Sequence, residues 1–241
     1  MQLLNYSVLI LLLCSLSHYG QTIEPSTGVG RSRLQLELES LYVMEKEDGN
    51  KINSWSIPSF LIRYGISDAV ELQINVPYVM ESKYKDDSMV SSRTFLDNVQ
   101  AGVSVNLWHQ KGILPQAAIM ARALIPIYDY NNSDIGSLVA LNLSNSLTDQ
   151  LSLNYNLGWI ADQSGNSAYY IANLSWNMST VVHSFVEFFG STYNNINMNH
   201  NINSGIGFNL GNSFCLDLSI ASGLNQEMVF FGGVLTYQIE I

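Results

Sequence analysis

The fold of this 241-residue chain is indicated most directly by residues 151–159, which read LSLNYNLGW. Every odd-numbered side chain in this stretch is apolar or aromatic, and every even-numbered residue is serine, asparagine or glycine. An alternation with a period of two is typical of a β-strand whose two faces meet different surroundings. These residues are therefore predicted to form a strand with one apolar face and one uncharged polar face.

The same alternation recurs along much of the chain. It is clear in residues 70–78, 99–107, 168–178, 201–210 and 214–220, and it begins well in residues 34–44. Residues 55–64, 116–126, 135–147, 181–191 and 228–240 read as strands with mixed faces. The total is about twelve strands, each near the roughly 10 residues that a tilted membrane strand needs.

The composition indicates what the two faces meet. Only 12% of the residues are charged, about half the share in an average soluble domain, whereas 47% are hydrophobic. The balance of 20 acidic and 10 basic residues gives a net charge of −10, which argues against a nucleic-acid partner. After the N-terminus no run of about 18 apolar residues could form a spanning helix. Alternating apolar and uncharged polar residues favour a membrane β-barrel instead.

The predicted connections alternate in length, as they do in outer-membrane barrels, which have short periplasmic turns and longer outer loops. Short connections are expected near residues 67–68, 110–112, 148–149, 179–180 and 211–212, and longer ones near 46–52, 81–93, 128–134, 162–167, 193–199 and 224–227. We predict an all-β fold, a transmembrane antiparallel up-and-down β-barrel of about twelve strands. Pro58, near the middle of its strand, is predicted to mark a bulge.

The N-terminus resembles an export signal. Residues 1–20 contain no Asp, Glu, Lys or Arg and hold a short apolar core at residues 8–13. We predict a signal peptide at 1–20, a periplasmic lead at 21–33 and an outer-membrane barrel at 34–241. Two fates stay open for Cys14, which is either lipidated or removed with the signal. Its removal would leave Cys215 as the sole thiol.

Several motifs resemble the outer-membrane barrel family of meta-pathway phenol-degradation transporters. They are PSFLIRYGIS at 58–67, VEL at 70–72, ALIP at 123–126, FVEFFG at 185–190, DLS at 217–219 and GGVLTY at 232–237. Together they span most of the chain beyond the signal. The resemblance implies a barrel of about twelve strands and a role in the passage of small molecules.

If the apolar faces meet lipid, the polar faces point into the lumen and collect charge there. The candidate lumen and selectivity residues are Arg63, Glu71, Arg122, Glu187, Asp217, Glu37 and Glu39. Two bases against five acids would attract cations. Charges in a narrow lumen should also pair with one another, because an unpaired buried charge is costly. A structural network and a selectivity constriction are both compatible with this set.

No catalytic or cofactor motif stands out. The chain has no Gly-x-Ser-x-Gly elbow, and His183 and Ser184 lie on opposite faces of their predicted strand. His109, His183 and His200 show no close ligand spacing for a metal. We therefore predict no enzymatic activity, no catalytic residue, no cofactor and no metal.

The favoured function is an outer-membrane channel for small solutes, hydrophobic or aromatic ones included. Its expected partners are the outer-membrane lipid, the solute and, during biogenesis, the barrel-assembly machinery of a Gram-negative cell. One alternative is a closed structural or interaction barrel whose extracellular loops bind partners. An outer-membrane hydrolase and a soluble β-sandwich are the further alternatives, and each receives less weight.

Overall fold

The structure is a computed structural model that describes residues 23–47, 50–56, 58–127, 134–162, 165–193 and 196–241. Its strands are β1 (Arg33–Glu47), β2 (Asn50–Ser56), β3 (Ser59–Gly65), β4 (Val70–Val76), β5 (Tyr78–Lys85), β6 (Ser88–Leu96), β7 (Val99–Trp108), β8 (Gln116–Ile125), β9 (Gly136–Ser146), β10 (Leu151–Asp162), β11 (Gly165–Asn177), β12 (Val182–Tyr193), β13 (Ile196–Leu210), β14 (Phe214–Gly223) and β15 (Met228–Glu240). Within these ranges no helix is long and apolar enough to cross a membrane. The predicted signal peptide at 1–20 lies outside the described residues.

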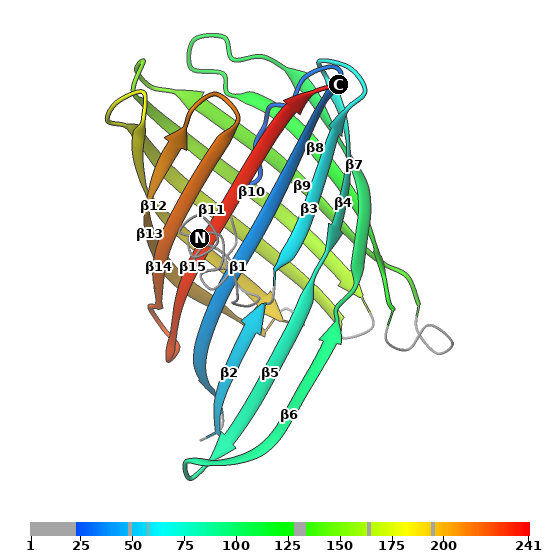
Figure 1. The fold of residues 1–241 in the computed structure, drawn as a ribbon, viewed down its shortest axis with the longest axis vertical. Helices are drawn as coiled ribbons and strands as arrows, with labels where there is room; N and C mark the ends of the chain where they lie inside the picture. Colours follow the sequence, from blue (N-terminus) through cyan, green and yellow to red (C-terminus); the bar gives the residue numbers. More distant parts are fainter. Residues whose placement is uncertain (1–22, 48–49, 57, 128–133, 163–164, 194–195) are drawn as a thin grey trace, which may run out of the picture.

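The strands form one antiparallel sheet that closes on itself (Figure 1). Closure occurs where β15 pairs with β1, from Arg33 opposite Glu240 to Glu45 opposite Met228. Three pairs of successive elements, β2 with β3, β4 with β5 and β6 with β7, are each one strand with a short interruption. Counted in this way, the described residues form a closed barrel of 12 strands, which confirms the predicted fold class.

The interruption at Pro58 is the predicted bulge. Glu39 lies opposite Ser59 and Tyr42 lies opposite Trp55, so three residue steps along β1 face four steps along the neighbouring strand. The extra residue falls between Trp55 and Ser59, beside Pro58, which has no N–H to give to the ladder. Pro77 also interrupts its strand, between β4 and β5, but there the extra residue belongs to the neighbouring strand, between Leu96 and Gln100.

The two ends of the barrel differ. We call the end that carries the C-terminus the turn end, at the top of Figure 1, where the N–H of Ile241 donates to the carbonyl of Ser32 at 2.8 Å. The opposite, hairpin end carries the β5–β6 hairpin, which extends furthest from the wall (Figure 1). The chain therefore enters and leaves the wall at the same end, as an even strand number requires.

The predicted long connections are mostly wrong. Residues 81–93 form the β5–β6 hairpin, whose turn is made by Asp86 and Asp87 with φ angles of 48° and 59°. Asp162 already pairs with Gly165, and Glu47 pairs with Asn50. The strands continue into these segments because the hydrogen bonds between backbone N–H and C=O groups form regardless of the side chains. Polar side chains therefore do not end the pairing of the strands. Residues 128–133 lie outside the described part of the chain.

The wall is polar inside and apolar outside. Along β4 the exposed fractions are 1% for Glu71, 47% for Leu72, 2% for Gln73 and 46% for Ile74. The wall is a single layer, so a buried side chain points into the lumen and an exposed one points outward. An outward apolar face on a closed sheet is what a bilayer requires of a spanning protein.

The lumen itself has two zones. Polar residues occupy the half nearer the turn end, whereas a buried apolar cluster fills the half nearer the hairpin end. The cluster comprises Leu41, Val43, Met120, Leu124, Leu138, Ala140, Tyr169, Ile171, Phe189, Ala221, Met228 and Phe230. The cluster therefore lies between the hairpin end and most of the charged residues.

Candidate functional site: the lumen

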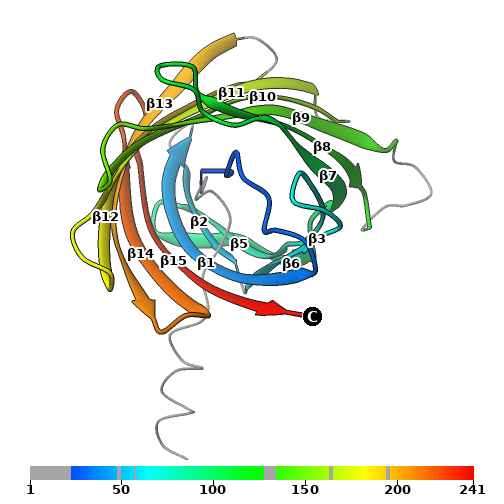
Figure 2. The ribbon, with the colours of Figure 1, turned by 90° about the horizontal axis from the view of Figure 1, so that it is seen from above.

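Residues 23–32, which we call the lumen segment, run inside the ring of strands. Figure 2, viewed from the turn end, shows this blue segment within the wall. The N–H of Glu24 donates to Asn156 Oδ1 at 2.8 Å, and Asn156 Nδ2 donates to the Glu24 carbonyl at 2.9 Å. Nearer the turn end, the N–H of Val29 donates to Glu71 Oε2 at 2.9 Å. The placement of 21–33 as a lead on the periplasmic side stays a prediction, but its described residues contact the lumen.

A glycine at the end of β3 lets the lumen segment leave the wall. The N–H of Ser32 donates to the carbonyl of Gly65 at 2.9 Å. A Cβ added at Gly65 would lie 1.8 Å from the carbonyl oxygen of Gly30. Any other residue at this position would therefore displace the segment.

The Glu24 carboxylate lies between two arginines of the wall. Its Oε1 accepts from Arg122 Nη2 at 2.5 Å, and its Oε2 accepts from Arg63 Nη2. Burial by itself raises the pKa of Glu24, but the charges and hydrogen bonds of Arg122 and Arg63 outweigh burial and hold the pKa below its ordinary value. Glu24 is therefore ionised at neutral pH, and the lumen segment is held by charge.

Each arginine has further partners. Arg63 Nε lies 3.2 Å from Glu37 Oε1, and Arg63 Nη1 lies 3.8 Å from Glu71 Oε1. Arg122 Nε donates to Gln73 Oε1 at 2.7 Å. The arginine side chains are only 3% and 6% exposed. Three acids, Glu24, Glu37 and Glu71, surround the two arginines, so neither buried positive charge is left without a partner of opposite charge.

The lumen segment divides the polar lumen into two cavities. The arginine cavity has a volume of about 310 Å³ and is lined by Glu24, Glu37, Arg63, Gln100, Arg122 and Tyr169, among others. The amide cavity has a volume of about 170 Å³ and is lined by Asn173, His183, Glu187, Asn203, Asp217 and Ser219, among others. Ile23 and Glu39 line both cavities.

Within the described part of the chain, the acids of the amide cavity have no arginine or lysine partner. Glu187 is 1% exposed and accepts from Asn173 Nδ2 at 3.4 Å and from Asn203 Nδ2 at 3.5 Å. Asp217 contacts His183 and Cys215. Glu39, between the two cavities, has no hydrogen bond or ion pair with the residues that the structure describes.

The seven candidate lumen residues are thus distributed over three places. Arg63, Arg122, Glu37 and Glu71 belong to one network that Glu24 joins, and all of them but Glu71 line the arginine cavity. Glu187 and Asp217 line the amide cavity, and Glu39 lines both cavities. Their role in selectivity stays a prediction.

Sequence reasoning missed two groups of residues. Glu24, which joins the two arginines, falls in the predicted lead and shows no strand pattern. The histidines were predicted to lack metal-ligand spacing, yet His183 Nε2 lies 2.7 Å from Asp217 Oδ1, and Cys215 is adjacent. No spacing along the chain could reveal either group, because both depend on which strands lie side by side.

Solved structures show the same fold. The COG4313 outer membrane channel from Pseudomonas putida F1 aligns with a TM-score of 0.70 and 9% identity, over 90% of this chain and 100% of that chain. A KdgM porin aligns with a TM-score of 0.56 and 10% identity, over 83% of this chain and 98% of that chain. A NanC porin aligns with a TM-score of 0.55 and 9% identity, over 84% and 98%.

Comparison of the sequence with curated proteins gives no match. A family model does match, over residues 20–233, and it confirms the family resemblance that the motifs indicated. The chain belongs to the family described as "Putative MetA-pathway of phenol degradation".

Proposed function

We propose that this chain is an outer-membrane channel, not an enzyme, and that it passes small solutes through its lumen. One observation carries the proposal: a closed 12-stranded wall is apolar outside and encloses two cavities inside. A barrel of this size falls between small barrels filled by side chains and wide open porins. It suits a narrow path or a single small ligand.

We infer that the solutes are small aromatic molecules with a polar group. The apolar half of the lumen places Tyr169 at the wall of the arginine cavity, where its ring can contact an aromatic solute. The same cavity is lined by Arg63 and Arg122, which can donate to a hydroxyl group of that solute. A phenol combines a ring with a hydroxyl group, which fits the description of the family.

The lumen charges serve two roles in this proposal. Arg63, Arg122, Glu37 and Glu71 form the structural network that fixes the lumen segment. Glu39, Glu187 and Asp217 line the cavities with carboxyl groups, whose ionised forms a cation in the lumen would stabilise, so that they set a preference for cations over anions.

The cellular setting completes the proposal. Residues 1–20 act as the export signal, the assembly machinery inserts the barrel, and the outward apolar face meets lipid. The turn end then faces the periplasm. Cleavage after Gly20 would make Glu24 the fourth residue of the mature chain, so the lumen segment would lie at its amino terminus.

Solute flux tests the proposal in outer-membrane vesicles, whose lipopolysaccharide leaflet resists apolar solutes. We expect phenol to enter vesicles that hold the protein faster than vesicles that hold the Phe189→Glu variant, which places charge in the apolar half. Equal phenol entry into both vesicles and into protein-free ones would exclude this solute class.

A closed structural barrel is the second candidate, and one observation favours it. The lumen segment crosses the lumen, and the apolar cluster is at most 8% exposed. Folded protein that passes neither phenol nor ions would establish the closed barrel and refute the channel.

A further inference from the structure

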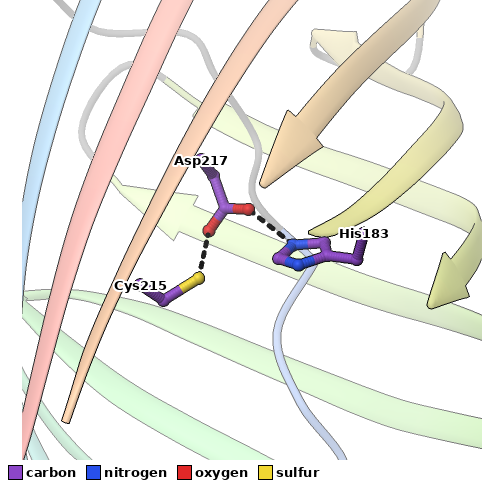
Figure 3. Close-up of side chains that lie close together, drawn as sticks. All are labelled: His183, Cys215 and Asp217. Atoms are coloured by element: carbon purple, nitrogen blue, oxygen red, sulfur yellow. Dashed lines mark hydrogen bonds and ion pairs between the residues drawn. The ribbon is translucent and has the colours of Figure 1, made fainter. Parts of the chain in front are cut away.

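Three side chains with metal-binding atoms meet near the turn end of the amide cavity. Figure 3 shows His183 on β12 and Cys215 and Asp217 on β14 pointing toward one another. His183 Nε2 lies 2.7 Å from Asp217 Oδ1, and Cys215 Sγ lies 3.5 Å from Asp217 Oδ2. One donor atom from each residue lies within 4.8 Å of the other two.

Strand register places these residues together. On β13, which lies between β12 and β14, Gly207 is opposite His183 on one side and opposite Asp217 on the other. The three positions form one row across the sheet. Cys215 is two residues before Asp217 on β14, so its side chain leaves the same face of the strand.

Gly207 provides the space in which the row closes. A Cβ at this position would lie 2.1 Å from His183 Cε1 and Nε2, and 2.2 Å from Asp217 Oδ1. The side chains of His183 and Asp217 therefore meet across β13, in space that the side chain of any other residue at position 207 would fill. The contact depends on a glycine in the middle of a strand, where glycine otherwise weakens the structure.

The donor set indicates a class of metal. A tetrahedral zinc site has bonds of about 2.0 to 2.3 Å, which places its ligand atoms roughly 3.3 to 3.8 Å apart. The sulfur of Cys215 lies 3.5 Å from Asp217 Oδ2, and His183 Nε2 lies 2.7 Å from the other oxygen, Oδ1. Because one donor atom from each residue lies within 4.8 Å of the other two, shifts of about 1 Å in these side chains would bring three ligand atoms to this spacing. Thiolate and imidazole favour zinc-like ions over calcium and magnesium, which prefer oxygen.

The position of the residues leaves room for a fourth ligand. His183 and Asp217 line the amide cavity, and their side chains are 20% and 26% exposed. Water or a solute atom in the cavity could complete the coordination. Sites with three protein ligands and one open position are typical of metals that contact a second molecule.

We propose that His183, Cys215 and Asp217 form a lumen binding site for a divalent transition metal of the zinc class. On binding, the metal forms one bond each to Cys215 Sγ, an Asp217 oxygen and a ring nitrogen of His183. The thiol proton leaves to bulk water, and the imidazole stays neutral with its single proton on the ring nitrogen that does not bind the metal, so one proton is released in total. Asp217 gives up its contact with the His183 N–H in this exchange. The proposal does not depend on which solute the barrel passes.

Titration with Co²⁺ tests the site in the folded, detergent-solubilised protein without a histidine tag. We expect one equivalent to bind, with a thiolate-to-cobalt charge-transfer band in the near ultraviolet, and Zn²⁺ to displace it. Cys215→Ser should abolish the band. His183→Gln and Asp217→Asn should each weaken binding by at least the roughly tenfold that loss of even an outer-shell partner costs.

One matched control and one geometric variant sharpen the test. His200→Gln removes a histidine from the outward face of β13, where it contacts Tyr170. This variant should bind Co²⁺ as the unaltered protein does. Gly207→Ala keeps all three ligands but fills the space between them, so it should weaken binding.

Heat-modifiable gel mobility shows which variants are folded. If a variant does not fold, Co²⁺ binding by the unaltered protein still tests the proposal. A folded wild-type barrel that gives no charge-transfer band overturns the proposal. A charge-transfer band that persists in folded Cys215→Ser, or unchanged affinity in folded His183→Gln, overturns it as well.

Discussion

The two cavities of the lumen differ in how their acids are compensated. In the arginine cavity Glu24 lies between Arg63 and Arg122, and each guanidinium has a second partner. In the amide cavity Glu187 contacts only asparagine amides. Ion pairs with good geometry fix a structure, whereas an acid with neutral partners can still interact with a passing cation. The arginine cavity therefore anchors the lumen segment, and the amide cavity is the place where a passing cation would be recognised.

The largest effect is expected from Arg122→Ala, which removes one side of the anchor. It leaves Glu24 with one arginine and removes the charged partner of Gln73. Loss of one partner from a buried ion pair costs about 3 to 5 kcal/mol. Denaturant unfolding followed by gel mobility measures this loss.

The control for this variant is Arg93→Ala, which breaks the exposed pair with Glu81 and should cost about 1 kcal/mol or less. Equal losses for the two variants would mean that the buried network does not stabilise the barrel.

Glu24→Ala should have the next largest effect, on conductance as well as on stability. Arg63 keeps Glu37, and Arg122 keeps Gln73 and Gln100, but the lumen segment loses two charge-assisted hydrogen bonds of about 1.5 to 3 kcal/mol each. Since 1.4 kcal/mol is a factor of ten in an equilibrium constant, the segment should leave its site at least about tenfold more often. Open-channel occupancy in planar bilayers measures this change, and unaltered occupancy would refute charge as the anchor.

Glu187→Gln should change selectivity with little effect on stability. The substitution keeps the size of the side chain and an acceptor for Asn173 or Asn203, so unfolding should shift by about 1 kcal/mol or less. The preference for cations should fall, and the reversal potential in a salt gradient measures it. A stable variant with the reversal potential of the unaltered protein would remove Glu187 from the ion path.

The smallest effect is expected from Glu39→Gln. This side chain lines both cavities and has no hydrogen bond or ion pair with the described residues, so removing its charge breaks no contact. We expect unchanged stability and a reversal-potential shift smaller than that of Glu187→Gln. A clear loss of stability would show that Glu39 belongs to the arginine network after all.

The wall of the barrel could be predicted from sequence because its signal is local. In residues 151–159 the polarity of a side chain indicates which face of the wall it lies on. Asn156 is fully buried, whereas its neighbour Leu157 is 55% exposed. Pro58 likewise reports a local irregularity, because its missing N–H excludes it from a regular ladder. The long outer connections failed as a prediction because polar residues such as those of β5 and β6 pair as readily as apolar ones do.

The contacts inside the lumen could not be predicted, because they join distant parts of the chain. Glu24 and Arg122 are 98 residues apart, and His183 and Asp217 are 34 apart. The contact between His183 and Asp217 depends on the register of three strands and on a glycine at one position. The alternation predicts which residues of a strand face inward. Which inward-facing residues of neighbouring strands lie side by side also depends on the register between the strands, and the alternation does not determine that register.

Single-channel recording of the folded protein in a planar bilayer tests the central claim most directly, with Glu24→Ala recorded beside it. A channel whose lumen segment is held by Glu24 predicts small, cation-preferring steps for the unaltered protein and larger or more frequent ones for the variant. The variant Glu227→Gln, altered in an exposed pair with Lys46, should match the unaltered protein. Silence from both the unaltered protein and Glu24→Ala, with each shown to be folded, would contradict the account and establish a closed barrel.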